Sequence, residues 1–383
     1  MPRALFFVTL IILTAFPPGV HAQVKPDAGN EESASRKVLT FGCLLPLTGK
    51  YRILGEKVLK GVLAAAESGH SGIQYRVVVK DIGDSDKRLA ASLDELLNTL
   101  GLSFIVVPVP SKFIQAVSPK VNSKRVPALV FPVSENEASG GPYIIKYYYP
   151  LEEQVRVLSG YAARGLGIRR FAILYPRTAL GARMKGLFAS DVAESGGKLV
   201  YEGSYDPGSR DISDELGWIS SAAPEAVFIP DGAASSAELI LRLKREGKLR
   251  DVLFLGPSTW NSPLFLDLIG QEIDGFVYRA VFTDIFYYGD WDWDWDEYSR
   301  LTEGKFNEKP DIFGYQVYRA LKLILSLNPE SGGGAVITDG LGSLRNNPYY
   351  DIEIDGGGSY RISPRYRILS VSDGELIDII NVR

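Results

Sequence analysis

"VLTFGCLLPLTG", residues 38–49, and "GEKVLKGVLAAAES", residues 55–68, predict the fold of this chain more clearly than any other stretch. The first is a nearly continuous apolar run that ends in a threonine-glycine pair, which is typical of a buried strand followed by a turn. In the second, apolar residues such as Val58 and Val62 recur at helical spacing. A buried strand followed by such a helix is the repeating unit of a parallel sheet covered by helices.

The alternation of strand and helix continues along the chain and begins a second time near residue 151. The further strand patterns are "IQYRVVVKDI", "LSFIVVPVP" and "VPALVFPVS", and then "RRFAILYP", "KLVYEGSY", "AVFIPDG", "DVLFLGPS" and "GFVYRAVF". This weak repeat predicts an α/β fold of two Rossmann-like lobes, each with a parallel sheet flanked by helices. The C-terminal residues read as hairpin strands, with turns at Asp355-Gly356 and Asp373-Gly374.

Length and charge exclude several classes of protein. The 383 residues are too many for one ordinary core and suit two lobes. A formal net charge of -4 is not that of a protein that neutralises nucleic-acid phosphates, so no nucleic-acid partner is expected. The single cysteine, Cys43, excludes an internal disulfide, and its apolar surroundings predict a buried thiol.

The N-terminus has the pattern of a secretory signal peptide. Arg3 precedes "ALFFVTLIILTAF", an apolar run that is short for a membrane span, and Val20-His21-Ala22 predicts cleavage before Gln23. We therefore expect a signal peptide at 1–22, a disordered leader at 23–36 and a periplasmic mature chain without a membrane span. An uncleaved membrane anchor is the alternative.

"YYGDWDWDWDEY", residues 287–298, is unusually acidic and aromatic. Asp294 is followed three residues later by Glu297, which resembles a capping box, and Tyr298 and Thr302 share a helical face. The pattern predicts a helix that begins at Asp294, preceded by a loop.

The loop before this helix has two interpretations. Trp291 and Trp293 are candidates for stacking on a ligand or a partner, although packing of the loop onto its own lobe is the favoured alternative. A calcium loop starting at Asp290 would need glycine and glutamate where Trp295 and Leu301 stand, so no metal is expected.

Signatures of catalysis are missing from the sequence. It contains no H-E-x-x-H, P-loop or G-x-S-x-G motif, so we expect no enzyme and no cofactor. An envelope hydrolase that uses the acidic loop is kept as a remote alternative.

Several segments, in order, resemble the branched-chain amino-acid-type periplasmic binding proteins, the type I solute-binding fold of ABC transporters. They include "GCLLPLTGKYRILGEKVLKGVLAA", "VPALVFPVSE", "RRFAILYPRTALGARMKGLF" and "PRYRILSVSDGELI". Within that superfamily, "FIPDGAASS" and "STWNSPLF" are similar to the penicillin-binding-protein activator branch.

The resemblance implies two lobes, 37–145 plus 284–328 and 146–283 plus 329–383, with a small-molecule ligand in the cleft between them. In such folds ligands bind outside the carboxyl ends of the strands. The candidate ligand-binding residues are Thr48, Tyr51, Ser111, Lys112, Ser134, Tyr148, Asp231, Ser258, Trp260, Trp291 and Trp293.

The departures from the amino-acid binders concern the groups that hold a free amino acid. Where the family binds the carboxylate with a serine pair, this chain has Pro110-Ser111. Where the family binds the amine with a tyrosine and an acid, it has Leu180 and Ser258. Asp231, at the neighbouring strand end, is the one group that would compensate, and without it the cleft is not expected to hold a free α-amino acid.

Two functions follow from the resemblance. The first is regulation of cell-wall synthesis by binding a penicillin-binding protein or an envelope ligand. The alternative is the solute-binding subunit of an ABC transporter, which would deliver a small polar ligand other than a free branched-chain amino acid to a permease.

Overall fold

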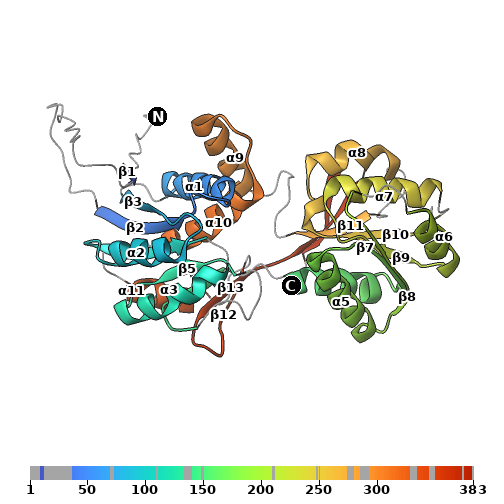
Figure 1. The fold of residues 1–383 in the computed structure, drawn as a ribbon, viewed down its shortest axis with the longest axis horizontal. Coiled ribbons are helices and arrows are strands. Elements are labelled where there is room, and N and C mark those ends of the chain that lie inside the picture. The colour runs from blue at the N-terminus through green and yellow to red at the C-terminus, as the bar shows by residue number, and fades with distance from the viewer. Residues whose placement is uncertain are drawn as a thin grey trace. The chain divides into compact units, whose positions relative to one another are not determined.

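The computed structural model divides the chain into two compact units, which are described one at a time (Figure 1). The first unit comprises Met1–Tyr149 and Asp294–Ser363, and the second comprises Pro150–Trp293 and Pro364–Arg383. The residues that the structure describes are 9–12, 37–69, 73–108, 111–132, 140–147, 151–208, 212–246, 249, 251–273, 280–284, 293–327, 334–344, 350–372 and 375–381.

The first unit is built on a sheet whose described strands follow the order β1-β3-β2-β4-β5-β6-β13-β12. Neighbouring strands from β1 to β13 run parallel, as the buried apolar runs predict. The strands are β1 Thr9–Ile12, β2 Lys37–Leu45, β3 Ile73–Asp81, β4 Leu102–Val107, β5 Ala128–Val130, β6 Ile144–Tyr147, β12 Tyr350–Ile354 and β13 Tyr360–Pro364.

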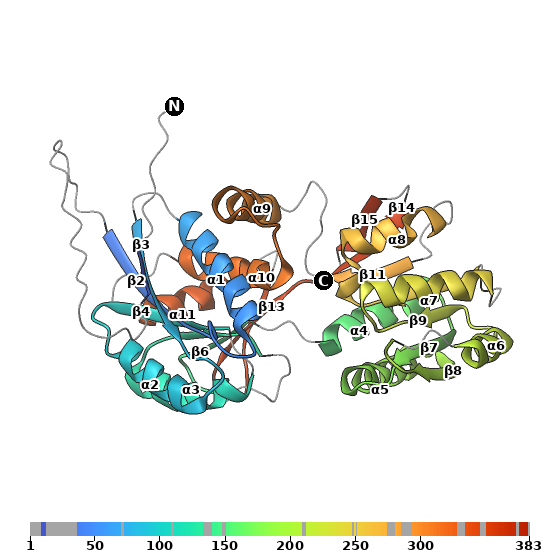
Figure 2. The ribbon, with the colours of Figure 1, turned by 45° about the horizontal axis from the view of Figure 1, so that its top comes forward.

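Helices cover both faces of this sheet (Figure 2). On one face α2 and α3 pack through residues such as Leu93 and Val117, while α1 and α10 pack against each other on the opposite face. The helices are α1 Arg52–Glu67, α2 Asp86–Leu97, α3 Ser111–Lys124, α9 Trp293–Phe306, α10 Ile312–Ser326 and α11 Gly334–Ser343.

The second unit has a sheet in the order β15-β14-β11-β10-β9-β7-β8. Its described pairs are parallel from β11 to β8, while β14 runs antiparallel to both β11 and β15. The strands are β7 Arg170–Pro176, β8 Lys198–Tyr205, β9 Ala226–Phe228, β10 Leu253–Gly256, β11 Ala280–Asp284, β14 Arg367–Ser372 and β15 Glu375–Asn381.

Two apolar clusters hold helices to the faces of the second sheet. One joins α6, α7 and α8 through residues such as Ile219, Ile240 and Phe265, and the other joins α4 and α5 through Val155 and Phe188. The helices are α4 Leu151–Gly160, the π-helix η2 Tyr161–Gly165, α5 Ala179–Glu194, α6 Ser213–Ala222, α7 Ala233–Arg245, the short 3-10 helix η3 Ser258–Trp260 and α8 Pro263–Ile273.

The expected fold class is confirmed: each unit is a helix-flanked α/β layer structure. The boundaries of the units differ from those of the expected lobes. The chain leaves the first unit after Tyr149 and returns at Asp294, and β12 and β13 belong to the first unit instead of the second. The reason is that β13 pairs in parallel with β6, a contact that a local hairpin pattern cannot reveal.

Some expectations concern the chain ends. Thr9–Ile12, inside the expected signal peptide, forms β1 beside β3, and the expected leader at 23–36 lies outside the described residues. The expected turn at Asp373-Gly374 also lies outside them, although the strands on either side of it pair antiparallel. Within the described ranges, none of the helices is both long and apolar enough to cross a bilayer.

The expected helix near Asp294 is present as α9, and its acids have a packing role. Asp294 and Glu297 both accept hydrogen bonds from Lys322 Nζ on α10, at 2.8 and 2.6 Å. The ring of Trp295 packs edge-on against Tyr315, with the ring centroids 4.9 Å apart. This part of the acidic stretch therefore fastens α9 to α10.

Cys43 lies in β2 and is fully buried, as the sequence predicts. Burial raises the pKa of its thiol far above the ordinary value, so the reactive thiolate is suppressed. We expect no modification of native protein by a thiol reagent on a timescale at which denatured protein reacts fully. Rapid labelling of the native chain would contradict this placement of β2.

Candidate functional site

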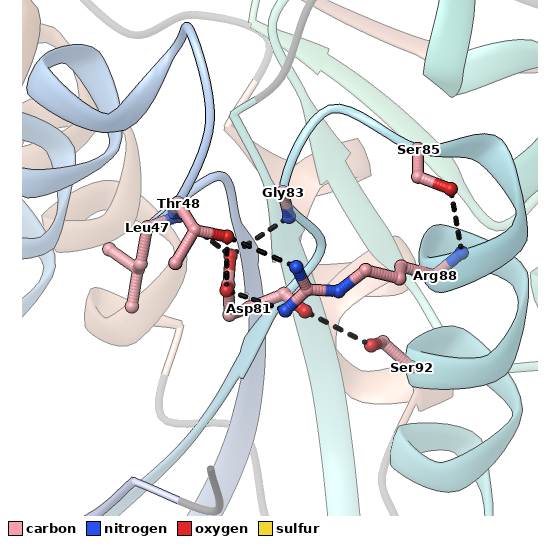
Figure 3. Close-up of polar contacts among 7 residues, drawn as sticks. All are labelled: Leu47, Thr48, Asp81, Gly83, Ser85, Arg88 and Ser92. Atoms are coloured by element: carbon pink, nitrogen blue, oxygen red, sulfur yellow. Dashed lines mark hydrogen bonds and ion pairs between the residues drawn. The ribbon is translucent and has the colours of Figure 1, made fainter. Parts of the chain in front are cut away.

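The loops at the carboxyl edge of the first sheet converge on one carboxylate, that of Asp81 (Figure 3). Its Oδ1 accepts hydrogen bonds from the backbone N–H groups of Leu47 at 2.9 Å, Thr48 at 3.2 Å and Gly83 at 2.8 Å. Its Oδ2 accepts from Thr48 Oγ1 and from Arg88 Nη2, both at 2.7 Å. The last residue of β3 thus joins the loop after β2 to the loop after β3.

The electrostatics of this cluster favour an ionised Asp81. Burial alone would raise the pKa of Asp81, but the hydrogen bonds from Thr48, Gly83 and Leu47, with the charge of Arg88, hold it below its ordinary value. The carboxylate therefore stays charged and keeps its hydrogen bonds throughout the neutral range.

Thr48 and Tyr51, two of the predicted ligand residues, lie in the loop after β2, but their environments differ. The Thr48 hydroxyl donates to Asp81 and accepts from Arg88 Nη1 at 3.1 Å. Tyr51 is partly exposed at the start of α1, with Lys50 Nζ 4.8 Å from its ring centroid. Between them Gly49 has φ +80°, where a side chain would be strained and would also press on Asp84.

The structure describes no side-chain positions for the remaining candidate ligand residues of the first unit. Ser111 and Lys112 open α3, but their side chains are not among those described, and Ser134 and Tyr148 lie outside the described residues. Tyr147, which precedes Tyr148 in the chain, is buried at the end of β6 and packs against the rings of Phe131 and Tyr350.

At the carboxyl edge of the second sheet, Asp231 follows β9 and is fixed by its neighbours. Its Oδ2 accepts a hydrogen bond from Tyr205 Oη at 2.6 Å, and its Oδ1 accepts from the backbone N–H of Gly232 at 2.7 Å. Thr259 Oγ1 donates to the backbone oxygen of Asp231 at 2.7 Å. Burial, and then the bond to Asp231, raise the pKa of Tyr205 well above its ordinary value, so the phenol remains a donor.

The two other candidates on this edge have different environments. Ser258 lies on η3 next to Thr259, and its backbone N–H donates to Gln154 Oε1 at 3.4 Å. Trp260, by contrast, is 0% exposed and stacks on Phe265 in the core. The structure thus brings Asp231 and Ser258 to one edge and places Trp260 beneath it.

Sequence reasoning missed the residues that order each of these edges within its own unit: Asp81 and Arg88 in the first unit, and Tyr205 in the second. Asp81 and Arg88 stand in "KDIGDSDKR", which the sequence suggested only as a strand end and a helix start, and Tyr205 ends β8. Their hydrogen-bond partners lie 7 to 40 positions away along the chain, so no local sequence pattern predicts these bonds. An acid at the end of a buried strand was the one available signal.

For the tryptophan loop, the residues 287–293 before the expected helix, the structure describes no side-chain positions. Trp291 lies outside the described residues, and Trp293 begins α9 with a side chain that is not described. Among the residues described, no group of three or more His, Cys, Asp or Glu side chains could hold a metal ion.

Comparison with known proteins relates this chain to a family. A family model described as periplasmic binding protein matches residues 38–340. A Leu/Ile/Val-binding protein homolog 3 from Brucella melitensis is 24% identical over 238 residues, covering 60% of this chain and 64% of the relative. The Leu/Ile/Val-binding protein BraC3 of Rhizobium johnstonii is 23% identical over 243 residues, covering 60% and 62%. The chain thus spans a little under two thirds of the length of these relatives.

Solved structures agree with this assignment at the level of the fold. A provisionally named branched-chain amino acid ABC transporter from Rhodospirillum rubrum has a TM-score of 0.74 at 18% identity, covering 89% of this chain and 100% of that one. A branched-chain amino acid transporter substrate-binding protein from Streptococcus pneumoniae, solved with isoleucine, has a TM-score of 0.60 at 17% identity, with coverages of 89% and 100%. Since the family model spans most of the chain, the protein belongs to the periplasmic binding protein family.

Proposed function

We propose that this protein is the solute-binding subunit of an ABC transporter, and that it delivers a small polar ligand other than a free branched-chain amino acid to a permease. Membership of the family and the names of the relatives support a non-enzymatic binding role. The signal-peptide pattern at 1–22 supports export to the periplasm.

The observation that carries the ligand class is the environment of Asp231. Tyr205 Oη and the Gly232 N–H orient the carboxylate at a strand end, where type I folds place ligands. A carboxylate has about four lone-pair sites, and these two bonds use only two of them. A cationic group on the solute, such as an ammonium or guanidinium, is the partner that this oriented carboxylate fits.

Free leucine, isoleucine and valine should leave the melting temperature unchanged at sub-millimolar concentration. Leu180 and Ser258 stand where the resembling family places its amine-binding groups, and Leu180 is apolar and exposed. A free amino acid also carries a carboxylate, and Pro110-Ser111 stands where the resembling family binds that group with a serine pair, so its lost hydration would not be compensated. A thermal-shift series checks this, because a ligand at 100 times its Kd adds about 2.7 kcal/mol. A clear shift with leucine would contradict the prediction.

Asp231→Asn should weaken binding of a cationic solute by roughly 10- to 100-fold, because hydrogen bonds to charged groups contribute about 1.5–3 kcal/mol. The probes are amines, amino-acid amides and short basic peptides that raise the melting temperature of the wild type, measured by titration calorimetry. Tyr205→Phe, which removes only the orienting hydroxyl, should lose less. Asp94→Asn, at an exposed ion pair with Lys120, is the control. If the wild type and Asp231→Asn bound the cationic solute with equal affinity, Asp231 would not be a ligand contact.

Regulation of cell-wall synthesis is the second candidate. It is favoured by Leu180 and Ser258, because a protein that does not carry amino acids needs no amine-binding groups. The segments similar to the activator branch also favour it. A screen that also contains muropeptides and a purified penicillin-binding protein separates the two functions. Binding of either, with no shift for any amine or peptide, would favour regulation over transport.

A further inference from the structure

We infer that Asp81 and Arg88 are positioning residues. They bind the hydroxyl of Thr48 and thereby fix the loop 46–51 in the conformation that presents Tyr51 to the solute. This inference rests on the proposed solute-binding function. It also replaces the direct ligand role that the sequence suggested for Thr48.

The first step is the convergence of three backbone donors on one oxygen. Leu47 and Thr48 belong to the loop after β2, and Gly83 belongs to the loop after β3, yet all three N–H groups reach Oδ1 of Asp81. Backbone N–H groups at the end of a strand need partners, and a largely buried carboxylate supplies three at once. The two loops are therefore fixed relative to each other by a single side chain, which is 13% exposed.

The second step concerns the hydroxyl of Thr48. A hydroxyl has one proton to donate, and this proton goes to Asp81 Oδ2 at 2.7 Å. Arg88 closes the arrangement from the other side, since Nη1 donates to Thr48 Oγ1 and Nη2 donates to Asp81 Oδ2. The three side chains form a closed ring of hydrogen bonds, so a ligand anion has no donor to claim from Thr48.

The third step is the direction of the loop after Thr48. Gly49 turns the backbone at positive φ, the Arg52 N–H donates to the Gly49 oxygen at 3.3 Å, and α1 begins. Tyr51 precedes the helix with no side-chain capping bond, and its ring is partly exposed. The bonded Thr48 thus fixes the start of the turn that carries Tyr51, whose partly exposed ring has its centroid 4.8 Å from Lys50 Nζ.

The second unit offers a comparison at the corresponding place. "PRT", residues 176–178 at the end of β7, matches "PLT", residues 46–48 after β2. Asp81 is the last residue of β3, and Asp206 directly follows β8. There Asp206 binds the side chain of Arg177 at 2.7 and 3.0 Å, and both side chains are mostly exposed. Exposed pairs of this kind fix little, so Asp206 is the matched control for Asp81.

The test uses the full mature chain with the variants Asp81→Asn, Thr48→Val, Thr48→Ser and the double variant Asp81→Asn/Thr48→Val. The Asp81→Asn substitution keeps one carbonyl oxygen for the backbone donors and loses the charge that holds Thr48 and Arg88, so the fold should survive. Amide hydrogen exchange at Thr48 should rise roughly tenfold or more in Asp81→Asn and Thr48→Val, because the bond from this N–H to Asp81 is weakened. Exchange should return towards the wild-type rate in Thr48→Ser. Leu47 is a weaker reporter, since its N–H also donates to the Leu45 backbone oxygen at 3.1 Å. Asp206→Asn should leave exchange at Arg177 unchanged, because that N–H donates to the Tyr205 backbone.

The affinity arm uses the amine or peptide that shows the largest thermal shift. Asp81→Asn and Thr48→Val should each weaken binding by about tenfold per folded molecule, and the double variant should be no weaker than the worse single one. Additive losses, or weaker binding in Thr48→Val with unchanged exchange, would overturn the inference in favour of direct contact by Thr48. If no solute binds, the proposed function fails, whereas the exchange arm still decides whether Asp81 fixes the loop.

Discussion

Replacing Trp260 by alanine should lower the free energy of unfolding of the second unit by about 3–5 kcal/mol, the usual cost of removing a large core side chain. The indole is fully buried, stacks on Phe265 with centroids 4.7 Å apart, and also contacts the ring of Phe282. Its other neighbour is Gly256, where any side chain would overlap the indole ring. Denaturant unfolding of the full chain, with fluorescence and circular dichroism followed together, measures the loss.

Trp218 on α6 is the matched control for this variant, because it is 64% exposed. Trp218→Ala should change stability by no more than about 0.5 kcal/mol. If Trp260→Ala kept its stability and lost ligand binding, Trp260 would be a ligand contact, as the sequence suggested, instead of a core residue.

Gly61→Val should destabilise the first unit by about 3 kcal/mol or more, since it forces two packed helices apart. A side chain at Gly61 on α1 would overlap the backbone carbonyl oxygen of Gly314 on α10, and a carbonyl cannot rotate away as a side chain can. Gly61→Ala should cost less, because the helix propensity of alanine returns up to about 1 kcal/mol. Melting temperatures of both variants check the order.

Gly304→Ala, in α9, is the control for the helix substitutions. A side chain at Gly304 would meet nothing within 4 Å, so alanine should raise stability by about 0.5–1 kcal/mol through helix propensity alone. If Gly61→Ala stabilised the protein as much as Gly304→Ala, the close approach of α1 and α10 would be wrong.

The tryptophan loop remains a prediction of the sequence. Replacing Trp291 and Trp293 together should weaken ligand or partner binding by roughly tenfold and leave the melting temperature little changed, because stacking contacts contribute on the order of 1 kcal/mol each. Asp290→Asn with Asp292→Asn is the control, and it should change binding much less. A large loss of stability with unchanged binding per folded molecule would instead indicate a packed structural loop.

The sequence by itself determined the elements and the class of fold. Apolar runs and helical spacing are local signals, and they act within ten or so residues, so the burial of Cys43 in β2 and the start of a helix at Asp294 followed from pattern alone. The repetition of strand and helix was enough to predict two helix-flanked sheets of mainly parallel strands, although β14 runs antiparallel to its neighbours.

Only the tertiary structure decided which partners these elements take. The strands β12 and β13 look like a free hairpin in sequence, but their sheet is chosen by the pairing of β13 with β6, more than 200 positions earlier in the chain. Trp260 follows a strand end in the same way as Ser258, yet its ring turns into the core while Ser258 stays at the edge. Thr48 is a predicted ligand residue from its place after a strand, but the bond from its hydroxyl to Asp81, 33 positions later, comes from the tertiary structure. Periodicity fixes the face on which a side chain lies, whereas the atom that it meets there depends on chain segments that only folding brings together.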